Sequence, residues 1–564
     1  MLVSPQTLPD DPERLKMLVT ECSERHAALE QEVAALAQEV GEKGSALAEL
    51  QHLIAEQRSE NTWLREQLLL LRQKHFGASS ERLSEEQLLL MLQAEGARAA
   101  REVPEPAAGA VTVKEHQRGH GGRRPLPEAW PRIEVLHDLP EDQKICPQDG
   151  QPLKRIGEEI SEQLSYTPAQ MRVLRHVRPK YACPVCEEGV AIAPPPPQLI
   201  PKSMAAPSLL AHVAVSKYAD AVPLYRQTKV LERHGADLPR STLASWMIRS
   251  GEAVQPLINL SRDVLLQGFM MQCDETRQKV LKEPGKSAQS WSYIWAQRGG
   301  PPGAPVILFD YDPSRSGEVP KRLLAGFEGR YLQVDGYTGY DAFFRENPGV
   351  RRVGCWAHQR RKFDEAFKVQ QQVKGKRGKS RQKQLKTSKA LEGLNWIRKL
   401  YEVERQAAGL SAEERYRLRQ ARGQPILAAI KEWLQQVKPQ VPPKSLTGRA
   451  LGYLSDHWEN LVRYLEDGRL EIDNNAVENA IRPIALGRKN IRFSDTVRGA
   501  EAGANLYSLI ETAKANGLEP QTYLCLVFRD LPSAACVEDY ERLLPTRWTA
   551  DSVRAALDEG GIPT

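Results

Sequence analysis

Two aspartates in the middle of the chain follow short apolar, β-prone runs. GFMMQCDET carries Asp274 and RYLQVDGY carries Asp335, each at the polar end of its run. Because strand ends present polar side chains while strand bodies stay buried, we expect neighbouring strands to bring the two carboxylates together. Carboxylate oxygens suit Mg²⁺, which keeps water molecules that a substrate phosphate can displace. The two aspartates therefore form a candidate divalent-cation site.

A third carboxylate, Glu478, lies in the run EIDNNAVENAIRP. Asp473 or Asn474 can cap a helix that starts there, and we expect Pro483 to limit the extent of that helix. Glu478 and Ile481 are three residues apart and share a helical face, which we expect to point toward the sheet. Such a helix can bring Glu478 to the two aspartates.

Three acids of this kind suit phosphoryl transfer on a nucleic acid. Two cations held roughly 3.5–4 Å apart can activate the attacking oxygen and stabilise the leaving oxygen. Spacing alone does not select the acids, because Asp310 and Asp312 also follow an apolar run, in VILFDYDPS. Basic residues that we expect to surround the acids are candidate contacts to a DNA backbone, namely Arg360, Arg361, Lys362, Arg482, Arg488, Lys489 and Arg492.

Two cysteine clusters lie in a small unit over residues 131–200 that we expect to be zinc-finger-like. Cys183 and Cys186 form C-x-x-C, half of a tetrahedral zinc site, whereas Cys146 to Asp149 read C-x-x-D. A carboxylate oxygen can ligate zinc, so one interpretation is a Cys₃Asp site that binds Zn²⁺ more weakly than four thiolates. The alternative is a finger without metal, held by its small apolar core.

A separate C-x-x-H, formed by Cys355 and His358, follows Asp335 in the chain. One Cys and one His are too few ligands for a zinc site. We expect these two side chains either to pack beneath the sheet or to support the acids from behind.

The elements that must position these residues have an α+β pattern. Over residues 264–345, short apolar runs alternate with Gly/Pro-rich turns, and helical patterns follow. The sequence predicts an α+β core over 264–500 with a helical insertion over about 370–444, followed by a helical tail over 501–564. The insertion includes a basic stretch, 374–389, with eight Lys or Arg residues and no acid.

The N-terminal part of the chain has a heptad pattern of mostly apolar residues between Leu15 and Leu71. The pattern predicts a self-associating coiled coil over residues 12–75, and a long helix packed on its own domain is the alternative. Residues 76–130 contain many Ala, Gly, Pro and Arg residues, a composition that is typical of a linker.

Residues 201–260 have a helical pattern that is broken at Gly235. The second helix begins near Arg240, and Ser241 or Thr242 can cap it. A helix, a short turn and a capped helix with basic surface residues suit a helix-turn-helix DNA reader, although any pair of antiparallel helices has the same pattern. Arg240 is the candidate DNA contact of this unit.

The bulk composition is that of a soluble protein with several domains. A length of 564 residues allows three or four compact units, and 41% of the residues are apolar and 27% charged. The net charge of +6 agrees with a nucleic-acid partner without requiring one. The chain shows no long apolar run, no secretory signal and no disulfide scaffold. We therefore expect a cytoplasmic protein without a membrane partner.

Several stretches resemble the transposases of the insertion sequence sixty-six family. They cover residues 76–525 in the family's order and read FGASSERL, VRPKYACPVC, LIPKSMAAPSLLAHVAVSKYADAVPLYRQ, RSTLASWM, QCDET, LQVDGYTGY, GCWAHQRRKF, IDNNAVENAIRPIALGRKN and YSLIETAKANGLEP. The resemblance implies a DDE-type enzyme with an RNase H-like core, and its motifs map onto Asp274, Asp335 and Glu478. It also implies a second C-x-x-C in the finger, from which this chain departs at Asp149.

The resemblance implies a DNA transposase that binds the inverted repeats at the ends of a mobile element. Two Mg²⁺ ions, or Mn²⁺ in their place, would support strand nicking and then joining of the freed 3′-hydroxyl to target DNA. The coiled coil would assemble two or more protomers, because paired element ends must be processed together. The family also implies two small accessory proteins encoded beside it. Two alternatives stay open: a catalytically silent DNA-binding regulator, and an RNase H-like nuclease without strand transfer.

Overall fold

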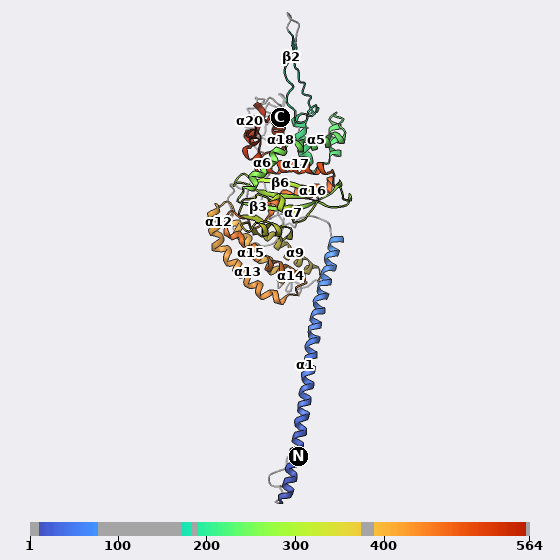
Figure 1. Cartoon of the computed structure of the whole chain (residues 1–564), viewed down its shortest axis with the longest axis vertical. Coiled ribbons are helices and arrows are strands. Elements are labelled where there is room, and N and C mark those ends of the chain that lie inside the picture. The colour runs from blue at the N-terminus through green and yellow to red at the C-terminus, as the bar shows by residue number, and fades with distance from the viewer. Residues whose placement is uncertain (1–10, 77–170, 183–189, 374–387, 560–564) are drawn as a thin grey trace, which may run out of the picture. The chain divides into compact units, whose positions relative to one another are not determined.

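The structure is a computed structural model that describes residues 11–76, 171–182, 190–373 and 388–559 (Figure 1). Within these ranges the protein is a mixed α+β structure and mostly helical. In the predicted finger unit it describes one hairpin, in which β1 (Lys180–Ala182) pairs antiparallel with β2 (Val190–Ile192). The predicted linker, nearly all of the basic stretch 374–389 and the candidate zinc ligands lie outside the described residues, the ligands being Cys146, Asp149, Cys183 and Cys186.

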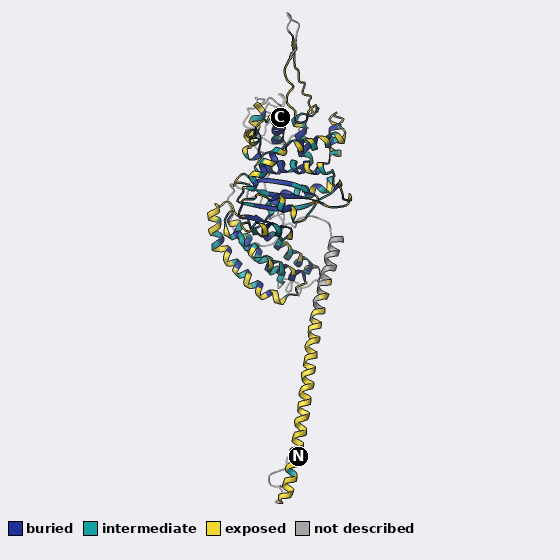
Figure 2. Ribbon diagram, in the orientation of Figure 1, coloured by how far each residue is buried: buried dark blue, intermediate teal, exposed yellow. Residues whose placement is uncertain are grey.

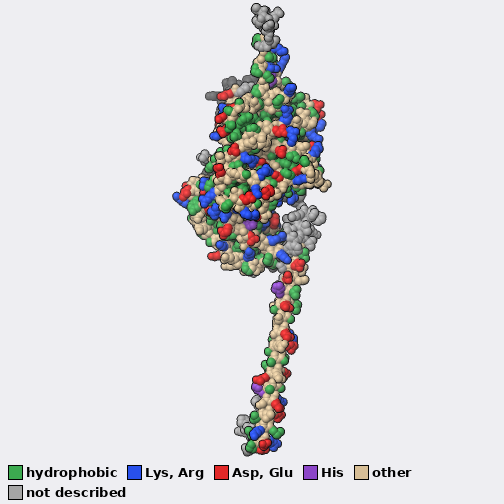
Figure 3. All heavy atoms as spheres, in the orientation of Figure 1, with side chains coloured by type: hydrophobic (Ala, Val, Ile, Leu, Met, Phe, Trp, Pro, Cys, Tyr) green, Lys and Arg blue, Asp and Glu red, His purple; other side chains and the backbone are tan. Residues whose placement is uncertain are grey.

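The N-terminal heptad region forms one long helix, α1 (Pro12–Phe76). Most of its described apolar side chains are exposed to solvent, among them Val33 at 65% and Leu47 at 62% (Figure 2). Apolar, acidic and basic side chains are interspersed along the helix (Figure 3). The apolar positions of a heptad become buried only when another helix covers them. The helix is therefore present, and its self-association stays a prediction.

Four helices precede the sheet, and they are α3 (Pro207–Tyr218), α4 (Leu224–Arg233), α5 (Arg240–Ala253) and α6 (Gln255–Leu266). The break between α4 and α5 includes Gly235, whose φ of 85° is a conformation that glycine adopts without steric cost. The predicted cap of the second helix is wrong. Pro239 occupies the N-cap position with extended backbone angles, so Ser241 and Thr242 lie inside the first turn and α5 has no side-chain cap.

A five-stranded mixed sheet lies at the centre of the described body (Figure 1). Its antiparallel part consists of β6 (Val306–Asp312), β5 (Ser292–Gly299) and β3 (Met270–Gln278), in that order. Two strands parallel to β3 complete the sheet, first β7 (Tyr331–Gln333) and then β8 (Arg351–Val353). The helix α7 (Glu318–Leu323) lies between β6 and β7, and α8 (Asp341–Glu346) lies between β7 and β8. A separate ribbon pairs β4 (Val280–Lys282) with β9 (Ser494–Thr496).

The helix that contains Glu478, α16 (Asn475–Ile491), packs on one face of this sheet. Its buried residues Ile481 and Ile484 belong to one apolar cluster with Ile294 and Ala296 of β5. The predicted direction of Ile481 is therefore confirmed. The predicted limit at Pro483 is wrong, because this proline lies inside the helix. Proline removes one helical hydrogen bond, and the buried contacts on both sides of it hold the helix to the sheet.

The next helix, α17 (Val497–Ala515), packs against the edge strand β6. Ser508 Oγ accepts a hydrogen bond from the N–H of Phe309 (2.8 Å), and Thr512 Oγ1 accepts one from Ile307 (3.0 Å). Side chains of a helix thus satisfy backbone groups that an edge strand otherwise exposes. Because α17 runs through residue 500, the predicted end of the core falls inside this helix.

The predicted insertion, about 370–444, lies within a longer helical region whose apolar core also includes Tyr331 of β7 and Val353 of β8. One buried ion pair ties its helices together, because Arg419 donates two hydrogen bonds to Glu404 (2.9 and 2.6 Å). The helices are α9 (Trp356–Val373), α11 (Lys389–Gln406), α12 (Ala412–Leu418), α13 (Gln424–Val437), α14 (Leu446–Asp456) and α15 (Trp458–Val462).

Three helices follow α17 and form the C-terminal part of the described chain. They are α18 (Pro520–Asp530), α19 (Val537–Arg542) and α20 (Ala550–Glu559). α18 packs on α3, so the C-terminal helices share a core with the helices that precede the sheet. Among the described helices, none combines the length and the apolar character needed to cross a membrane.

Candidate active site

The register of two parallel strands aligns the two aspartates. Gln272 of β3 lies opposite Gln333 of β7, and Asp274 and Asp335 each follow two residues later. Because side chains alternate along a strand, each aspartate lies on the same face as the glutamine that precedes it. Neighbouring strands are about 4.8 Å apart, so the two carboxylates start from adjacent positions on one face.

Glu478 reaches the same place from the first turn of α16. Burial raises the pKa of Asp274 well above its ordinary value, and the carboxylates of Glu275, Glu478 and Asp335 raise it further. The structure therefore brings the three predicted acids within electrostatic reach of one another. A buried, mutually repelling group of acids is stabilised by a divalent cation, which supplies the missing positive charge.

The competing aspartates on β6 are already paired. Asp310 binds Arg262 (2.6 Å) and accepts a hydrogen bond from Gln297 (2.6 Å). Asp310 lies opposite Trp295 of β5, which in turn lies opposite Glu275 of β3, so these three side chains share one face of the sheet. Asp274 is the neighbour of Glu275, and because side chains alternate along a strand it points to the opposite face. Asp312 pairs with Arg322 (2.6 Å). Neither is placed with the other three acids.

Two buried glutamines lie beneath the aspartates, and the sequence argument missed both. Gln272 and Gln333 are fully buried and hydrogen bonded to each other (2.7 Å). Gln272 also donates to the carbonyl of Asp473 (3.2 Å), and Gln333 donates to that of Glu471 (2.9 Å). The pair thus ties the segment before α16 to the two aspartate strands. The signal was a polar residue two positions before each aspartate, in MMQCD and YLQVD.

The C-x-x-H motif supports the same segment from the other side. Cys355 is buried, and burial raises the pKa of its thiol, which donates a hydrogen bond to Asn474 Oδ1 (2.8 Å). His358 Nδ1 lies 3.4 Å from Glu478 Oε1, and burial lowers the pKa of His358. The predicted support of the acids agrees with these contacts. Potential ligand atoms of Cys355, His358 and Glu478 lie within 4.8 Å of one another.

The expected cap of α16 is divided between two residues. Asn474 is the N-cap but makes no side-chain cap, because its amide oxygen accepts from Cys355. Asp473 instead accepts a hydrogen bond from the N–H of Asn475 (3.0 Å). The hydroxyl of Tyr401, from α11 of the insertion, also donates to Asp473 (2.6 Å). Burial raises the pKa of Asp473 from 3.8 to about 6.

A second network holds the loop that follows β7. Both side-chain nitrogens on one edge of Arg315 donate to Glu275, the residue after Asp274. The guanidinium lies 3.9 Å from the ring centroid of Tyr337, whose N–H donates to Asp335 Oδ1 (2.8 Å). Burial raises the pKa of Glu275. This chain of contacts fixes the backbone around Asp335, and sequence reasoning did not find it.

The predicted DNA-contacting cations fall into two groups. Arg361 lies at the acids, where it pairs with Glu478 (3.2 Å). Arg360 and Lys362 adjoin it in α9, and the Lys362 ammonium lies 4.4 Å from the ring centroid of Tyr453. Arg482 is one helical turn beyond Glu478 and half-buried. The remaining four, Arg240, Arg488, Lys489 and Arg492, instead line a groove farther along α16.

The expectation that Arg488, Lys489 and Arg492 surround the acids is therefore wrong, whereas Arg240 was expected to contact DNA from the helix-turn-helix-like unit. Arg488 lies ten residues beyond Glu478 on the same helix. A rise of about 1.5 Å per residue separates the two positions by about 15 Å along the helix axis. Sequence proximity placed them together, but a straight helix carries them apart.

Comparison with known proteins identifies four matching regions. Residues 202–502 match the family described as "Transposase IS66 family", and residues 143–187 match the "zinc-finger binding domain of transposase IS66". Residues 63–135 match "Transposase C of IS166 homeodomain", and residues 508–546 match the "IS66 C-terminal element".

Proteins similar to this chain occur in Sinorhizobium fredii (strain NBRC 101917 / NGR234). The protein named Uncharacterized protein y4jD is 35% identical over 444 residues, which is 76% of this chain and 83% of that protein. Uncharacterized protein y4qI is 31% identical over 573 residues, covering 98% of this chain and all of that protein. Uncharacterized protein y4hP is 31% identical over 498 residues, or 86% and 89% of the two chains.

Proposed function

This chain belongs to the transposase IS66 family, and we propose that it nicks and joins DNA at a divalent-metal site formed by Asp274, Asp335 and Glu478. The observation that supports these residues most directly is the β3–β7 register, which aligns the two aspartates. The family supports transposase activity in general, and the residues and steps are our proposal. We interpret the five-stranded sheet, with its helical insertion, as an RNase H-like core.

The donor set fits two Mg²⁺ ions, with Mn²⁺ as a substitute, because all three acids offer hard oxygen ligands. When bound, such ions activate the attacking oxygen and stabilise the leaving oxygen of the phosphodiester. The chain's own residues hold the geometry: Gln272 and Gln333 fix the approach of α16 to the strands. Arg361 is placed to contact the DNA phosphate that enters beside Glu478.

Other parts of the chain supply the remaining functions of this proposal. The helices α4 and α5 act as the helix-turn-helix-like unit that binds the inverted repeats at element ends. The exposed apolar positions of α1 pair with a second copy, which brings two ends together. The finger region matches a zinc-finger family, and we propose Zn²⁺ as its ligand, with Asp149 replacing one cysteine. Two small accessory proteins of the element complete the proposed partners.

The test is strand nicking of element-end duplex DNA with Mg²⁺, comparing the wild type with Asp335→Asn. We expect the variant to bind DNA and to lose nicking by about 10³-fold, or roughly 4 kcal/mol of transition-state stabilisation. Asp310→Asn is the matched control, because it makes the same change on the opposite face of the sheet and should retain nicking.

Three outcomes would contradict parts of the proposal. Wild type that binds but does not nick, with accessory proteins present, would indicate a silent regulator. Nicking that survives Asp335→Asn would remove this residue from the site. Pre-nicked ends that are never joined to target DNA would indicate a nuclease without strand transfer.

A further inference from the structure

A groove of about 1330 Å³ lies at the far end of α16 from Glu478. Its walls are the exposed face of α5 and the C-terminal half of α16, and its floor includes the start of α17 and the β4–β9 ribbon. We infer that this groove binds the phosphate backbone of element-end duplex DNA, about 15 Å along α16 from the acids. The inference rests on the proposed function, because it takes the nicked phosphate to lie at Glu478.

The charge of the groove favours a polyanion. Among its lining residues Asp495 is the only acid, and it is paired with Lys282 (2.8 Å). The lining cations are Lys217, Arg226, Arg240, Arg249, Lys282, Arg488, Lys489, Arg492 and Arg498. Three of them, Arg240, Arg249 and Arg492, are exposed and make no ion pair with any acid in the described part of the chain. A row of uncompensated cations is the electrostatic signature of a nucleic-acid surface.

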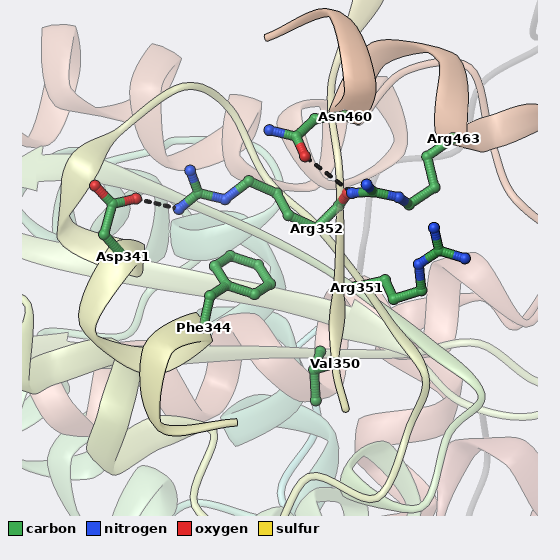
Figure 4. A pocket seen from close by; sticks show the side chains of 7 residues that line it. All are labelled: Asp341, Phe344, Val350, Arg351, Arg352, Asn460 and Arg463. Atoms are coloured by element: carbon green, nitrogen blue, oxygen red, sulfur yellow. Dashed lines mark hydrogen bonds and ion pairs between the residues drawn. The ribbon is translucent and has the colours of Figure 1, made fainter. Parts of the chain in front are cut away.

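A second basic pocket shows what a compensated cluster looks like. This pocket, of about 400 Å³, lies beside β8 and is lined by three arginines (Figure 4). Arg352 donates to Asp341 (2.6 Å), and Arg351 pairs with Glu466 (2.5 Å). Arg463 also lies near Glu466 (3.6 Å). Because each of these arginines has an acid of the chain within 4 Å, two of them sharing Glu466, the pocket serves the fold and does not compete with the groove for DNA.

The groove presents hydrogen-bond donors in a regular row. Ser241, Ser245 and Arg249 are four residues apart on α5, all exposed and all lining the groove. Side chains at this spacing share one helical face. Hydroxyl and guanidinium groups on such a face can contact both phosphates and base edges. A helix that can read bases favours the element end over target DNA as the occupant.

The opposite wall ends in a strained turn that is also placed in the groove. Arg492 has a φ of 60°, and the N–H of Phe493 donates to the carbonyl of Ile491 (2.7 Å). This is a three-residue γ-turn of the rare, strained kind. Glycine would adopt it more cheaply, and strain of about 1–3 kcal/mol is typical of functional positions. Keeping an arginine there is consistent with a use for its side chain.

Each wall of the groove is tied to a neighbouring element of the described chain. Asn490 of α16 donates to the carbonyl of Ala221, before α4 (3.3 Å). Arg498 of α17 pairs with Glu252 of α5 (2.7 Å). The walls therefore form a preformed site, which lowers the entropic cost of binding. Phosphates along one strand rise by about 3.4 Å each, so the groove should hold phosphates four to five nucleotides from the nicked bond.

The test is DNA binding by the full chain with Arg240, Arg249 and Arg492 all changed to Ala, measured by fluorescence anisotropy over a salt series. The slope of log K against log salt should become shallower by about 2.7, or about 0.9 for each lost phosphate contact. At 0.1 M salt this slope corresponds to a loss of affinity of up to about 500-fold. The matched control is Arg554→Ala, an exposed arginine of α20 outside the groove and outside the proposed DNA-binding helices.

Two further measurements protect the result against a folding artefact. Changing the same three positions to Lys keeps the positive charges and should restore the wild-type salt slope. Misfolding of the Ala variant would not explain a salt slope that depends only on the charge at these positions. Phosphate ethylation should interfere with binding four to five nucleotides from the nick in the wild type, and this interference should vanish in the Ala variant.

Several outcomes would overturn the inference. One is a wild-type salt slope in the Ala variant, which would mean that the groove does not contact DNA phosphates. Another chain segment or a second copy would then be the occupant of the groove. Another outcome is phosphate-ethylation interference that persists unchanged in the Ala variant, which would place the contacted phosphates outside the groove. Failure of the proposed function is distinguishable: wild type that never nicks while the groove variants still lose binding would refute the metal site alone.

Discussion

The two ends of α16 are built on opposite physical principles. At the N-terminal end, Gln272, Gln333 and Cys355 donate buried hydrogen bonds to the segment that precedes the helix, and this segment positions Glu478. At the C-terminal end, exposed cations line an open groove. Buried polar groups must find partners or lose several kcal/mol, so the first end is rigid. At the second end, Arg492 makes no ion pair with an acid in the described part of the chain, and a ligand can neutralise its charge.

This contrast teaches how one helix can serve two tasks. Positioning a metal ligand requires a fixed backbone, whereas binding DNA requires positively charged side chains that are exposed to solvent. We therefore expect variants of the N-terminal end to change rates, stability and pH dependence with little effect on the salt slope. Variants of the C-terminal end should do the reverse.

The largest effect is expected at Asp473, where the buried end contains a titratable group. Because burial raises the folded-state pKa from 3.8 to about 6, the protonated form is favoured in the folded protein. The contribution of Asp473 to the free energy of unfolding is fully present below pH 3.8 and is lost as pH rises through about 6. Asp473→Asn should flatten this dependence and make the protein more stable by up to about 3 kcal/mol at pH 7.5, as urea unfolding at several pH values can measure.

Tyr401→Phe is the companion to this variant. The Tyr401 hydroxyl donates to the Asp473 carboxylate and lowers its pKa. Removing the donor should shift the loss of stability to a higher pH. If both variants keep the wild-type pH dependence, Asp473 is not the titrating group and the contrast between the two ends loses its pH component.

The next effect is on rate. Gln272→Leu removes the donor to the Asp473 carbonyl and breaks the pair with Gln333. Loss of an outer support of a metal ligand typically lowers activity by about 10–100-fold. We expect this loss in kcat for Mg²⁺-dependent nicking, with the DNA-binding salt slope unchanged.

Gln297→Leu is the matched control for that prediction. Gln297 is equally buried but lies opposite Cys273, so it points to the other face of the sheet and binds Asp310. It should cost stability without slowing nicking beyond the effect of unfolding. Equal loss of kcat in both variants would mean that the Gln272 effect reports general damage to the sheet.

These residues show which parts of the molecule the sequence could predict. Asp274 and Asp335 were predictable because an acid at the end of an apolar run is visible in the sequence, and the sheet does align them. Gln272 and Gln333 were missed because a single amide within an apolar run has no meaning until two strands pair. The choice among the acids came from the family resemblance, because Asp310 also follows an apolar run and competed with Asp274 and Asp335.

The errors at helix ends have a common cause. Pro483 stays inside α16, and Pro239 takes the place of the expected serine or threonine cap of α5. Local preferences at helix termini are about 1 kcal/mol, and tertiary packing outweighs them, since α16 packs on the sheet and α5 packs on α17. The basic residues beyond Glu478 were placed at the acids for a similar reason, because adjacency in sequence ignores the length of the helix that separates them.

The smallest effect sharpens the groove end of the comparison. Lys282 lines the groove but is already paired with Asp495, and both side chains are largely exposed. Such a pair contributes under about 1 kcal/mol to stability. Removing both partners, with Lys282→Ala and Asp495→Ala together, leaves the net charge unchanged and should leave the DNA-binding salt slope unchanged. Arg249→Ala alone, at an unpaired cation, should make the slope shallower by about 0.9.

If the paired and unpaired positions instead alter the slope equally, ion pairing within the chain does not decide which groove cations contact phosphate. Total basic charge would then be the governing quantity, and the distinction between compensated and uncompensated cations would fail.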